Sequence, residues 1–537
     1  MSEGRLLRDL KVPIGASHDQ IATLAAAHEG LKSSDVREVR IVKRSLDARR
    51  QRAPQHVLTL RLWTTEETPT PAPIPAPRVG RMRPYVAGEA PIIVGAGPAG
   101  LWAALRFIEA GEPCVLVERG QRLAGRHEGM RSLRRRGVLD PENNLCFGEG
   151  GAGTYTDGKL YTRKRAPEIR RVYEDFVAFG AQPEILVDAH PHIGTNRLIR
   201  VVDAVGRFLE DRGCELRFGT RVDGLLQDRA GRVSGVTLQS GEELRGPSVI
   251  LATGHSARDV FSWLHSAGVP LAPKPFAIGV RVEHPQALID HIQFGDHVSN
   301  PALGAAAYAL THRVSGRGVY SFCMCPGGFI LPTPTEAEHL NVNGMSNAGR
   351  GSPYANAALV VTVDPEDFWR EKPGDLDAHG PLSGVALQRH FERRAFDAGG
   401  RNYCAPAQRL TDFLAGRVGD VPTRTSYRPG LTAVDLTALL PARLREPLSR
   451  SVLAFDRKMP GFLTEEAVML GFETTTSSPV RVLRDKATLT PPDVEGLYPC
   501  GEGAGWAGGI VSSALEGIRC AEAAISVLGR RRGVGGS

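Results

Sequence analysis

A glycine-rich turn between two apolar segments constrains the fold of this chain more than any other feature. Residues 91–120 read PIIVGAGPAGLWAALRFIEAGEPCVLVERG: an apolar strand pattern, the glycines Gly95, Gly97 and Gly100, a helix pattern and a second apolar strand. In such a βαβ unit the first glycine permits a tight turn, the second lets the backbone approach a pyrophosphate, and the third allows close helix–strand packing. The stretch therefore predicts a dinucleotide-binding α/β domain.

An acidic residue closes the second strand of this unit. Glu118 stands where a carboxylate reaches the ribose hydroxyls of an adenosine. An acid at this place fits FAD or NAD and argues against the 2′-phosphate of NADP. The predicted nucleotide turn also includes Pro98, Ala99 and Arg119.

Two later segments bear on the choice between FAD and NAD. Residues 232–259 are typical of a hairpin and a strand that ends at Ala252, Thr253 and Gly254. Residues 494–524 give a short strand, then Gly501 and Glu502, then a glycine-rich start of a helix. A helix N-terminus aimed at the N1–C2=O edge of a flavin stabilises its anionic reduced form. We expect the N–H groups there to come from Gly508, Gly509 and Ile510.

From about residue 89 onward the chain resembles the FAD-dependent oxidoreductases of the glutathione-reductase-like superfamily. The matching stretches are VGAGPAG with VERG, ILATG, and YPCGEG, in which Glu502 replaces the usual aspartate but keeps the carboxylate. RSLDAR, GEGGAGTYTDGKLYTR, FCMCPGG and PCGEGAGWAGGI are similar to the uncharacterised bacterial FAD-dependent dehydrogenases that carry an extra N-terminal α/β domain. The resemblance implies a backbone contact from Val222 to the adenine, but no substrate.

The length of 537 residues predicts more than one domain. We expect an α/β protein: a Rossmann-like FAD-binding domain of glutathione-reductase type, an inserted mixed α+β substrate or cap domain, and a small N-terminal α/β domain. The prolines of residues 68–84 predict an extended connector, because proline neither continues a helix nor donates to a sheet. The expected boundaries are 1–66 for the N-terminal domain (helix 18–30, strands 36–46 and 55–63), 67–88 for the connector, 89–264 and 481–530 for the FAD-binding domain, 265–480 for the cap and 531–537 for a loose basic tail.

A second glycine-rich stretch, FGEGGAGTYTDGKL at 147–160, has no strand, helix and acid of its own. It therefore predicts no second dinucleotide but a backbone that runs along the same FAD, from pyrophosphate towards isoalloxazine. Lys159 is expected near flavin N5 or the substrate, and Glu149 is a candidate base. The other residues expected to contact FAD are Gly150, Gly151, Gly153, Thr154, Asp157 and Gly158.

The eight cysteines have neither zinc-ligand nor disulfide-framework spacing, and we predict no metal site. Cys323 and Cys325 would share one face of an extended strand, near the upper limit of disulfide reach. They are either a redox pair, two inert strand cysteines or part of a flavin-facing loop. Further candidate polar groups over the flavin are Arg281, Glu283, His284, Asn347, Arg350 and Asn356.

The composition limits the kinds of partner that we expect for this protein. A net charge of +7 spread over this length gives little reason to expect a nucleic-acid partner. No apolar run is long enough for a membrane span, and the first residues lack a secretory pattern, so we expect no membrane and a cytoplasmic location.

These patterns predict an FAD-dependent oxidoreductase, a dehydrogenase or reductase of an unidentified small molecule or redox partner. No second nicotinamide-binding unit follows the first, so NADH or NADPH would be a transient electron donor. Two alternatives remain: a flavin monooxygenase, and an FAD-containing electron-transfer or partner-binding module that uses residues 1–66 for docking.

Overall fold

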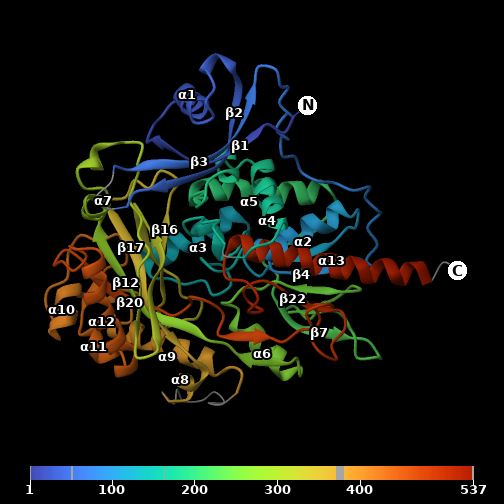
Figure 1. Cartoon of the computed structure of the whole chain (residues 1–537). Helices are drawn as coiled ribbons and strands as arrows, with labels where there is room; N and C mark the ends of the chain where they lie inside the picture. The colour runs from blue at the N-terminus through green and yellow to red at the C-terminus, as the bar shows by residue number, and fades with distance from the viewer. Residues whose placement is uncertain (1, 50–52, 163, 371–379, 535–537) are drawn as a thin grey trace.

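The computed structural model describes residues 2–49, 53–162, 164–370 and 380–534. The chain begins with a small α/β unit, shown in blue in Figure 1, in which one helix covers a three-stranded sheet ordered β1-β3-β2. The predicted helix and two strands are confirmed, and a strand that the sequence analysis missed precedes them. The elements are β1 (Arg5–Pro13), α1 (His18–His28), η1 (Ser33–Asp35), β2 (Val36–Asp47) and β3 (Gln55–Thr64).

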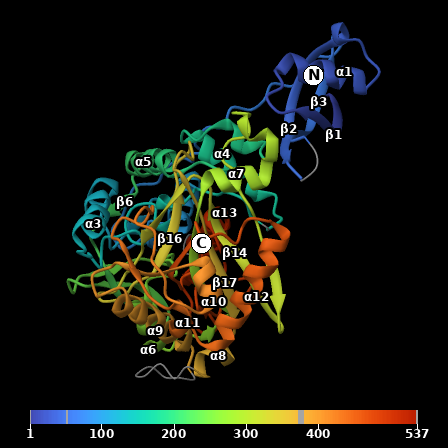
Figure 2. The ribbon, with the colours of Figure 1, turned by 90° about the vertical axis from the view of Figure 1, so that its left-hand side faces the viewer.

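The N-terminal unit stands away from most of the chain in Figure 2, and its edge strand β2 contacts the larger part. The N–H of Arg44 in β2 donates to the carbonyl of Val187 at 2.8 Å, and the N–H of Ala189 donates back to Arg44 at 2.9 Å. The guanidinium of Arg44 also donates to Asp188 at 2.7 Å. A short backbone pairing and one ion pair therefore fix this contact.

A parallel five-stranded sheet, ordered β22-β10-β4-β5-β6, lies at the centre of the second unit. Successive side chains of each strand point to opposite faces of the sheet, and both faces are buried. In β4, Ile93 packs beneath the helices, while Ile92 and Val94 pack against a smaller sheet on the other side. The strands are β4 (Ile92–Val94), β5 (Val115–Val117), β6 (Glu215–Arg217), β10 (Val249–Leu251) and β22 (Leu497–Pro499).

Helices cover the first face, and Figure 1 shows α13 lying along α2. They are α2 (Pro98–Glu109), α4 (Glu168–Ala178), α5 (Thr195–Asp211) and α13 (Ile510–Val534). The opposite face carries α6 (Arg258–Ser266) and the antiparallel sheet of β7 (Val222–Gln227), β8 (Val233–Leu238) and β9 (Glu243–Arg245). This sandwich of helices, sheet and smaller sheet is an α/β arrangement.

A larger seven-stranded sheet, ordered β13-β14-β17-β12-β20-β18-β19, occupies the part of the chain between about 276 and 473. Its pairs are antiparallel except for β18 with β19. The strands are β12 (Phe276–Pro285), β13 (Thr311–Val314), β14 (Arg317–Cys325), β17 (Tyr354–Val363), β18 (Ala405–Arg409), β19 (Leu431–Ala433) and β20 (Val468–Glu473).

Helices shown in orange in Figure 1 lie beside this sheet. They include α9 (Ser383–Ala398), α10 (Leu410–Ala415), α11 (Leu436–Leu439) and α12 (Ala442–Lys458). Buried Arg258 of α6 bridges to this region, because it donates to Glu392 of α9 at 2.6 Å and to Glu336 at 2.9 Å. The remaining elements are α3 (Leu123–Arg136), η2 (Ala152–Tyr155), η3 (Pro183–Leu186), β11 (Leu271–Pro273), α7 (Gln286–Phe294), η4 (Gly295–Ser299), β15 (Gly328–Pro332), β16 (Val342–Ser346), α8 (Pro365–Arg370) and β21 (Val480–Val482).

The structure of the C-terminal segment differs from the predicted loose tail. Helix α13 continues to Val534, so the expected loose tail at 531–537 is wrong for residues 531–534, and residues 535–537 fall outside the described part of the chain. A helix beginning at Ile510 and packed on α2 keeps its hydrogen-bonded ladder beyond the basic residues. Among the helices described, none has the length and apolar character needed to cross a membrane.

Candidate cofactor site

The first glycine turn is pressed against the end of β10. Gly95 has φ +107°, and a Cβ added there would lie 2.9 Å from the carbonyl carbon of Ala252. Only glycine fits this position without displacing the neighbouring strand. The N–H of Ala252 donates to the carbonyl of Val94 at 2.8 Å, so Ala252, Thr253 and Gly254 continue beside the turn.

Glu118 joins three parts of the site. Its buried carboxylate accepts from the N–H of Ala96 at 2.8 Å, of Gly120 at 2.9 Å and of Gly148 at 2.8 Å. Hydrogen bonds to an ionised acceptor are the stronger kind, so this carboxylate ties the turn, the end of β5 and the second glycine stretch together. A carboxylate accepts about four hydrogen bonds, which leaves capacity for a ribose hydroxyl.

The predicted adenine side lies next to Glu118. The N–H of Thr220 donates to the carbonyl of Glu118 at 2.9 Å, which brings the start of β7 at Val222 to this end of the site. The guanidinium of Arg119 pairs with Asp259 at 2.5 Å and lies 4.5 Å from the ring centroid of Phe147. It also lies 3.8 Å from Glu142, which pairs with Arg221 next to the start of β7.

The second glycine stretch crosses from the first turn to the start of α13. The N–H of Gly150 donates to the carbonyl of Ala96 at 2.8 Å. Gly151 has φ +64°, and an added Cβ there would lie 2.9 Å from the Cα of Gly97. A Cβ added at Gly153 would lie 3.0 Å from Cγ1 of Ile510. The backbone therefore runs from the first turn to the start of α13, along the carboxyl ends of the parallel strands, where such sheets bind ligands.

The C-terminal segment completes the cradle. Gly501 packs on α2, since an added Cβ would lie 2.9 Å from the Cβ of Ala99. Gly508 and Gly509 are exposed at the N-terminus of α13, where the first N–H groups lack backbone partners within the helix. The N–H of Gly508 is already satisfied, because it donates to the hydroxyl of Ser512 at 3.1 Å. The hydroxyl of Thr154 is buried and has no hydrogen-bond partner within the described part of the chain. Bare glycine backbone, a helix N-terminus and an unpartnered hydroxyl along one path fit an extended dinucleotide.

A charged group follows on the same stretch. The carboxylate of Asp157 lies 3.0 Å from Nζ of Lys159 through Oδ2 and 2.9 Å from Nε2 of His192 through Oδ1. Burial opposes ionisation, but the hydrogen bond from His192 and the charge of Lys159 hold the pKa of Asp157 well below its usual range. His192 was missed by the sequence analysis, because only the bridge between Lys159 and His192 brings it here.

Lys159 connects this group to the cysteine pair, because its ammonium donates to the carbonyl of Met324. Cys323 has φ +44°, and the pairing of β14 with β17 slips between Phe322 and Cys325. The expectation of two thiols on one face of a regular strand is therefore wrong. The bulge curls the chain, so that the Cys325 thiol donates to the Cys323 carbonyl at 3.2 Å.

The two thiols differ in their ionisation. The side chain of Cys325 lowers the pKa of the neighbouring Cys323 thiol, and the charges of Lys159 and Arg281 act in the same direction against the effect of burial. The side chain of Cys323, with burial, raises the pKa of Cys325. A thiolate is the reactive form of cysteine, so these surroundings favour Cys323 over Cys325 as the nucleophile.

A buried acid lies behind the cysteines. Arg281 donates to the carbonyl of Cys323 at 2.7 Å, and its Nε lies 3.3 Å from Oε2 of Glu473. Burial raises the pKa of Glu473 to about 8 although Arg281 opposes the shift. Burial also raises the pKa of Glu502, and Cys323 contributes to that shift. The guanidinium of Arg281 therefore joins the cysteine pair to a buried acid.

Two residues that the sequence suggested for the site, Glu149 as a base and His284 as a polar group over the flavin, make contacts typical of structural residues. Glu149 accepts from the N–H of Leu123 at 3.1 Å, in the first turn of α3, which favours a structural role over that of a base. His284 is buried against Phe462, whose carbonyl lies 2.8 Å from its Nε2, and burial lowers the pKa of His284 to about 4. The candidate position of His284 over the flavin is therefore wrong, because its side chain belongs to the core of the larger sheet.

Three stretches of the chain match known protein families. Residues 91–131 match an FAD binding domain, residues 275–476 match the family described as FAD-dependent protein, C-terminal domain-like, and residues 6–63 match a domain of unknown function. A Clostridium beijerinckii protein, described as uncharacterized, is 41% identical over 438 residues, which cover 80% of each chain.

The solved structures that match this chain are less similar to it than the Clostridium beijerinckii protein. The halogenase PltM is 10% identical with a TM-score of 0.39 over 83% of this chain and 70% of its own. The flavin-dependent brominase Bmp2 is 13% identical with a TM-score of 0.36, over 82% and 79%. A geranylgeranyl bacteriochlorophyll reductase-like protein of Thermoplasma acidophilum is 13% identical with a TM-score of 0.35, also over 82% and 79%. The prediction of FAD as cofactor is confirmed by the matching domains, and the chain belongs to the family of FAD-dependent proteins that includes its Clostridium beijerinckii relative.

Proposed function

We propose that this protein is an oxidoreductase that exchanges two electrons with a small molecule where Lys159, Cys323 and Cys325 meet the FAD cradle. The observation that carries the proposal is the contact of Lys159 with the backbone between the two cysteines. Lys159 belongs to the same glycine-rich stretch that passes Gly97 and Ile510. A charged and nucleophilic group thus lies at the end of the cradle predicted to hold the isoalloxazine.

We also propose that the FAD-binding domain is of the glutathione-reductase type. The order β22-β10-β4-β5-β6, with parallel pairing throughout, supports a glutathione-reductase type of FAD-binding domain. The seven-stranded sheet between its two parts would be the substrate or cap domain.

The bound FAD supplies two-electron chemistry, and the protein positions charges around it. Lys159 supplies a positive charge, and Asp157 with His192 fixes the direction of its side chain. The N–H groups at the start of α13 favour negative charge nearby. Cys325 keeps its proton while Cys323 favours the thiolate, so this pair can give or take a proton beside the site.

The cysteine pair supports a second candidate, a dithiol that takes part in electron transfer. Loss of two electrons and of the remaining thiol proton would convert the Cys323 thiolate and the Cys325 thiol into one disulfide. The bulge at Cys323 favours this candidate, because it breaks the regular strand geometry that would hold alternate residues near the upper limit of disulfide reach.

An anaerobic spectrum of the FAD-loaded protein tests the proposal. We expect the flavin band to bleach on addition of NADH or NADPH as a transient donor, and to return with an electron acceptor. Lys159→Met should slow bleaching while FAD content is kept, whereas Lys486→Met, an exposed lysine elsewhere, should not.

Other outcomes identify the alternatives. Oxygen consumption coupled to hydroxylation of an added compound would indicate a monooxygenase. A flavin that is reduced only in the presence of a partner protein would contradict the proposal and indicate an electron-transfer module. Unchanged bleaching and reoxidation in Cys323→Ser would exclude the dithiol.

A further inference from the structure

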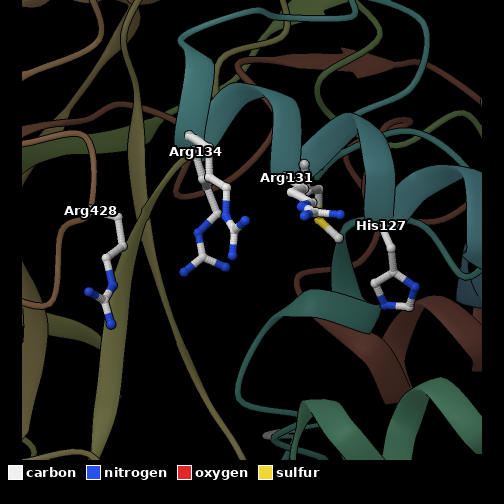
Figure 3. A pocket seen from close by; sticks show the side chains of 6 residues that line it. His127, Arg131, Arg134 and Arg428 are labelled. Atoms are coloured by element: carbon white, nitrogen blue, oxygen red, sulfur yellow. The ribbon is translucent and has the colours of Figure 1, made fainter.

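Four arginines converge on a hollow in the surface beside α3. The hollow has a volume of about 670 Å³. Figure 3 shows Arg131 and Arg134 extending from α3, with Arg428 on a separate segment beside them. The residues that line it are His127, Met130, Arg131, Arg134, Arg135 and Arg428.

The charges in this hollow are poorly balanced. Within the described ranges, Arg134, Arg135 and Arg428 have no carboxylate at ion-pair distance, while Arg131 has only Glu128 at 3.8 Å. Burial, followed by repulsion from Arg428 and Arg135, lowers the pKa of Arg134. The C-terminal end of α3 favours cations on that helix, but it gives no reason for Arg428 to face them. Converging cations without counter-charges are the usual feature of a site for carboxylate or phosphate.

A second cavity of about 210 Å³ adjoins the hollow and shares His127, Met130 and Arg134 with it. The rest of its wall is mainly apolar. It contains Leu133, Leu145, Ile199, Leu331, Pro332 and Met345, with Asn144, Tyr155 and Thr195 as polar members.

Tyr155 connects this inner cavity with the cofactor cradle. It follows Thr154 in the glycine-rich stretch, and its ring lies 5.5 Å from that of His127, measured between centroids. The Tyr155 side chain is buried, yet its hydroxyl has no hydrogen-bond partner within the described ranges. Buried hydroxyls are normally hydrogen-bonded, so this one is an unsatisfied polar group in the wall of the inner cavity.

We propose that the two cavities bind an anionic amphiphile, a small molecule whose carboxylate or phosphate lies among the arginines and whose apolar body fills the inner cavity near Tyr155. The inference rests on the proposed function, since it names the class of substrate that an oxidoreductase with this site would take. The apolar inner wall favours this class over a nicotinamide dinucleotide, which would place a polar ribose and carboxamide there.

Calorimetric titration of the FAD-loaded protein tests the inference. Octyl phosphate and octanoate serve as the two anionic probes, with octanol as the neutral probe and octyltrimethylammonium as the cationic one. We expect one or both anions to bind at least about tenfold more tightly than octanol and the cation, with affinity falling as salt is added. The better of the two anions identifies the head group.

Matched variants locate the binding. Arg134→Gln combined with Arg428→Gln should weaken binding of the better anion about tenfold or more. Arg136→Gln removes an exposed arginine of the same helix that pairs with Glu128 outside the hollow, and should leave binding unchanged. Met345→Trp should weaken octyl phosphate but not inorganic phosphate. FAD content and circular dichroism show that each variant is folded.

Three outcomes would overturn the inference: equal binding of octanol and the anions, equal binding by the double variant and the wild type, or binding of NADPH through Arg134 and Arg428 in place of either amphiphile. If a small molecule bleaches the flavin while neither anion binds, the inference fails and the proposed function stands. If the anions bind through Arg134 and Arg428 while no small molecule exchanges electrons with the flavin, the site is supported and the proposed function fails.

Discussion

The carboxylate of Asp157 lies between Lys159 and His192, with 3.0 Å to Nζ of the lysine and 2.9 Å to Nε2 of the histidine. Asp157→Asn removes the charge and leaves a partly buried ammonium without its carboxylate. We expect the free energy of unfolding at pH 7 to fall by about 2 kcal/mol. Urea unfolding of the FAD-loaded protein measures this change.

The pH dependence of that loss follows from the depressed pKa of Asp157. Its stabilisation is complete above the unfolded-state pKa near 3.9 and is lost as the pH falls through the lower folded-state pKa. The stability difference between the wild type and Asp157→Asn should therefore shrink below about pH 4. Asp211→Asn, at an exposed position, is the control and should show no such trend. A difference that stays constant to low pH would contradict the assigned ion pair.

Cys323 should be the most readily alkylated cysteine at neutral and mildly acidic pH, because its pKa is lowered by Cys325, Lys159 and Arg281. Iodoacetamide labelling of the reduced protein between pH 5 and 9, read by peptide mass spectrometry, measures this order. Lys159→Gln should shift the labelling profile of Cys323 to higher pH, whereas Lys486→Gln should not. Labelling of Cys323 only above pH 8 in the wild type would show that it is an ordinary thiol.

Glu118→Gln should weaken FAD binding by about tenfold or more, because an amide cannot accept charge-assisted hydrogen bonds from Ala96, Gly120 and Gly148. Fluorescence titration of the apoprotein with FAD gives the affinity. Glu243→Gln, an exposed glutamate of β9, should bind FAD as the wild type does. Equal affinity in the two variants would mean that Glu118 organises the loops without contributing to the nucleotide site.

Arg44→Ala should loosen the N-terminal unit with little effect on the rest, since the pair with Asp188 is about one-third exposed on each side and contributes about 1 kcal/mol or less. Hydrogen exchange should quicken at the amides of Arg44 and Ala189, which form the backbone pairing. The exchanged pair, Arg44→Asp with Asp188→Arg, should restore protection. Faster exchange throughout the parallel sheet would show that the unit is part of a single cooperative structure.

The nucleotide turn could be predicted because its causes are local. Gly95, Gly97 and Gly100 lie within one βαβ unit, so spacing alone relates them to the pyrophosphate. Strand β1 was missed because its alternation breaks: Asp9 has φ +57°, and pairing with β3 slips between Leu7 and Leu10. A pattern of period two does not survive such a bulge.

The rest of the site depends on contacts that no local pattern records. His192 reaches Asp157 and Arg428 reaches Arg134 only after distant segments have packed together. The cysteine pair was identified from its spacing, but its curl depends on the pairing of β14 with β17. The cofactor and its glycine turn could therefore be predicted from sequence patterns. The arrangement of charged side chains around the cysteines could not, because it depends on the tertiary structure.

The FAD cradle uses residues from Gly95 to Ile510, and its last strand and helix come from the final part of the chain. Until β22 has been synthesised, β10 has an unpaired edge, and until α13 is present, α2 lacks the helix that packs along it. Cofactor loading should therefore be a late event in biosynthesis. A nascent chain that stops before residue 497 would leave the ribosome with an open sheet edge and without the strand and helix that complete the FAD cradle.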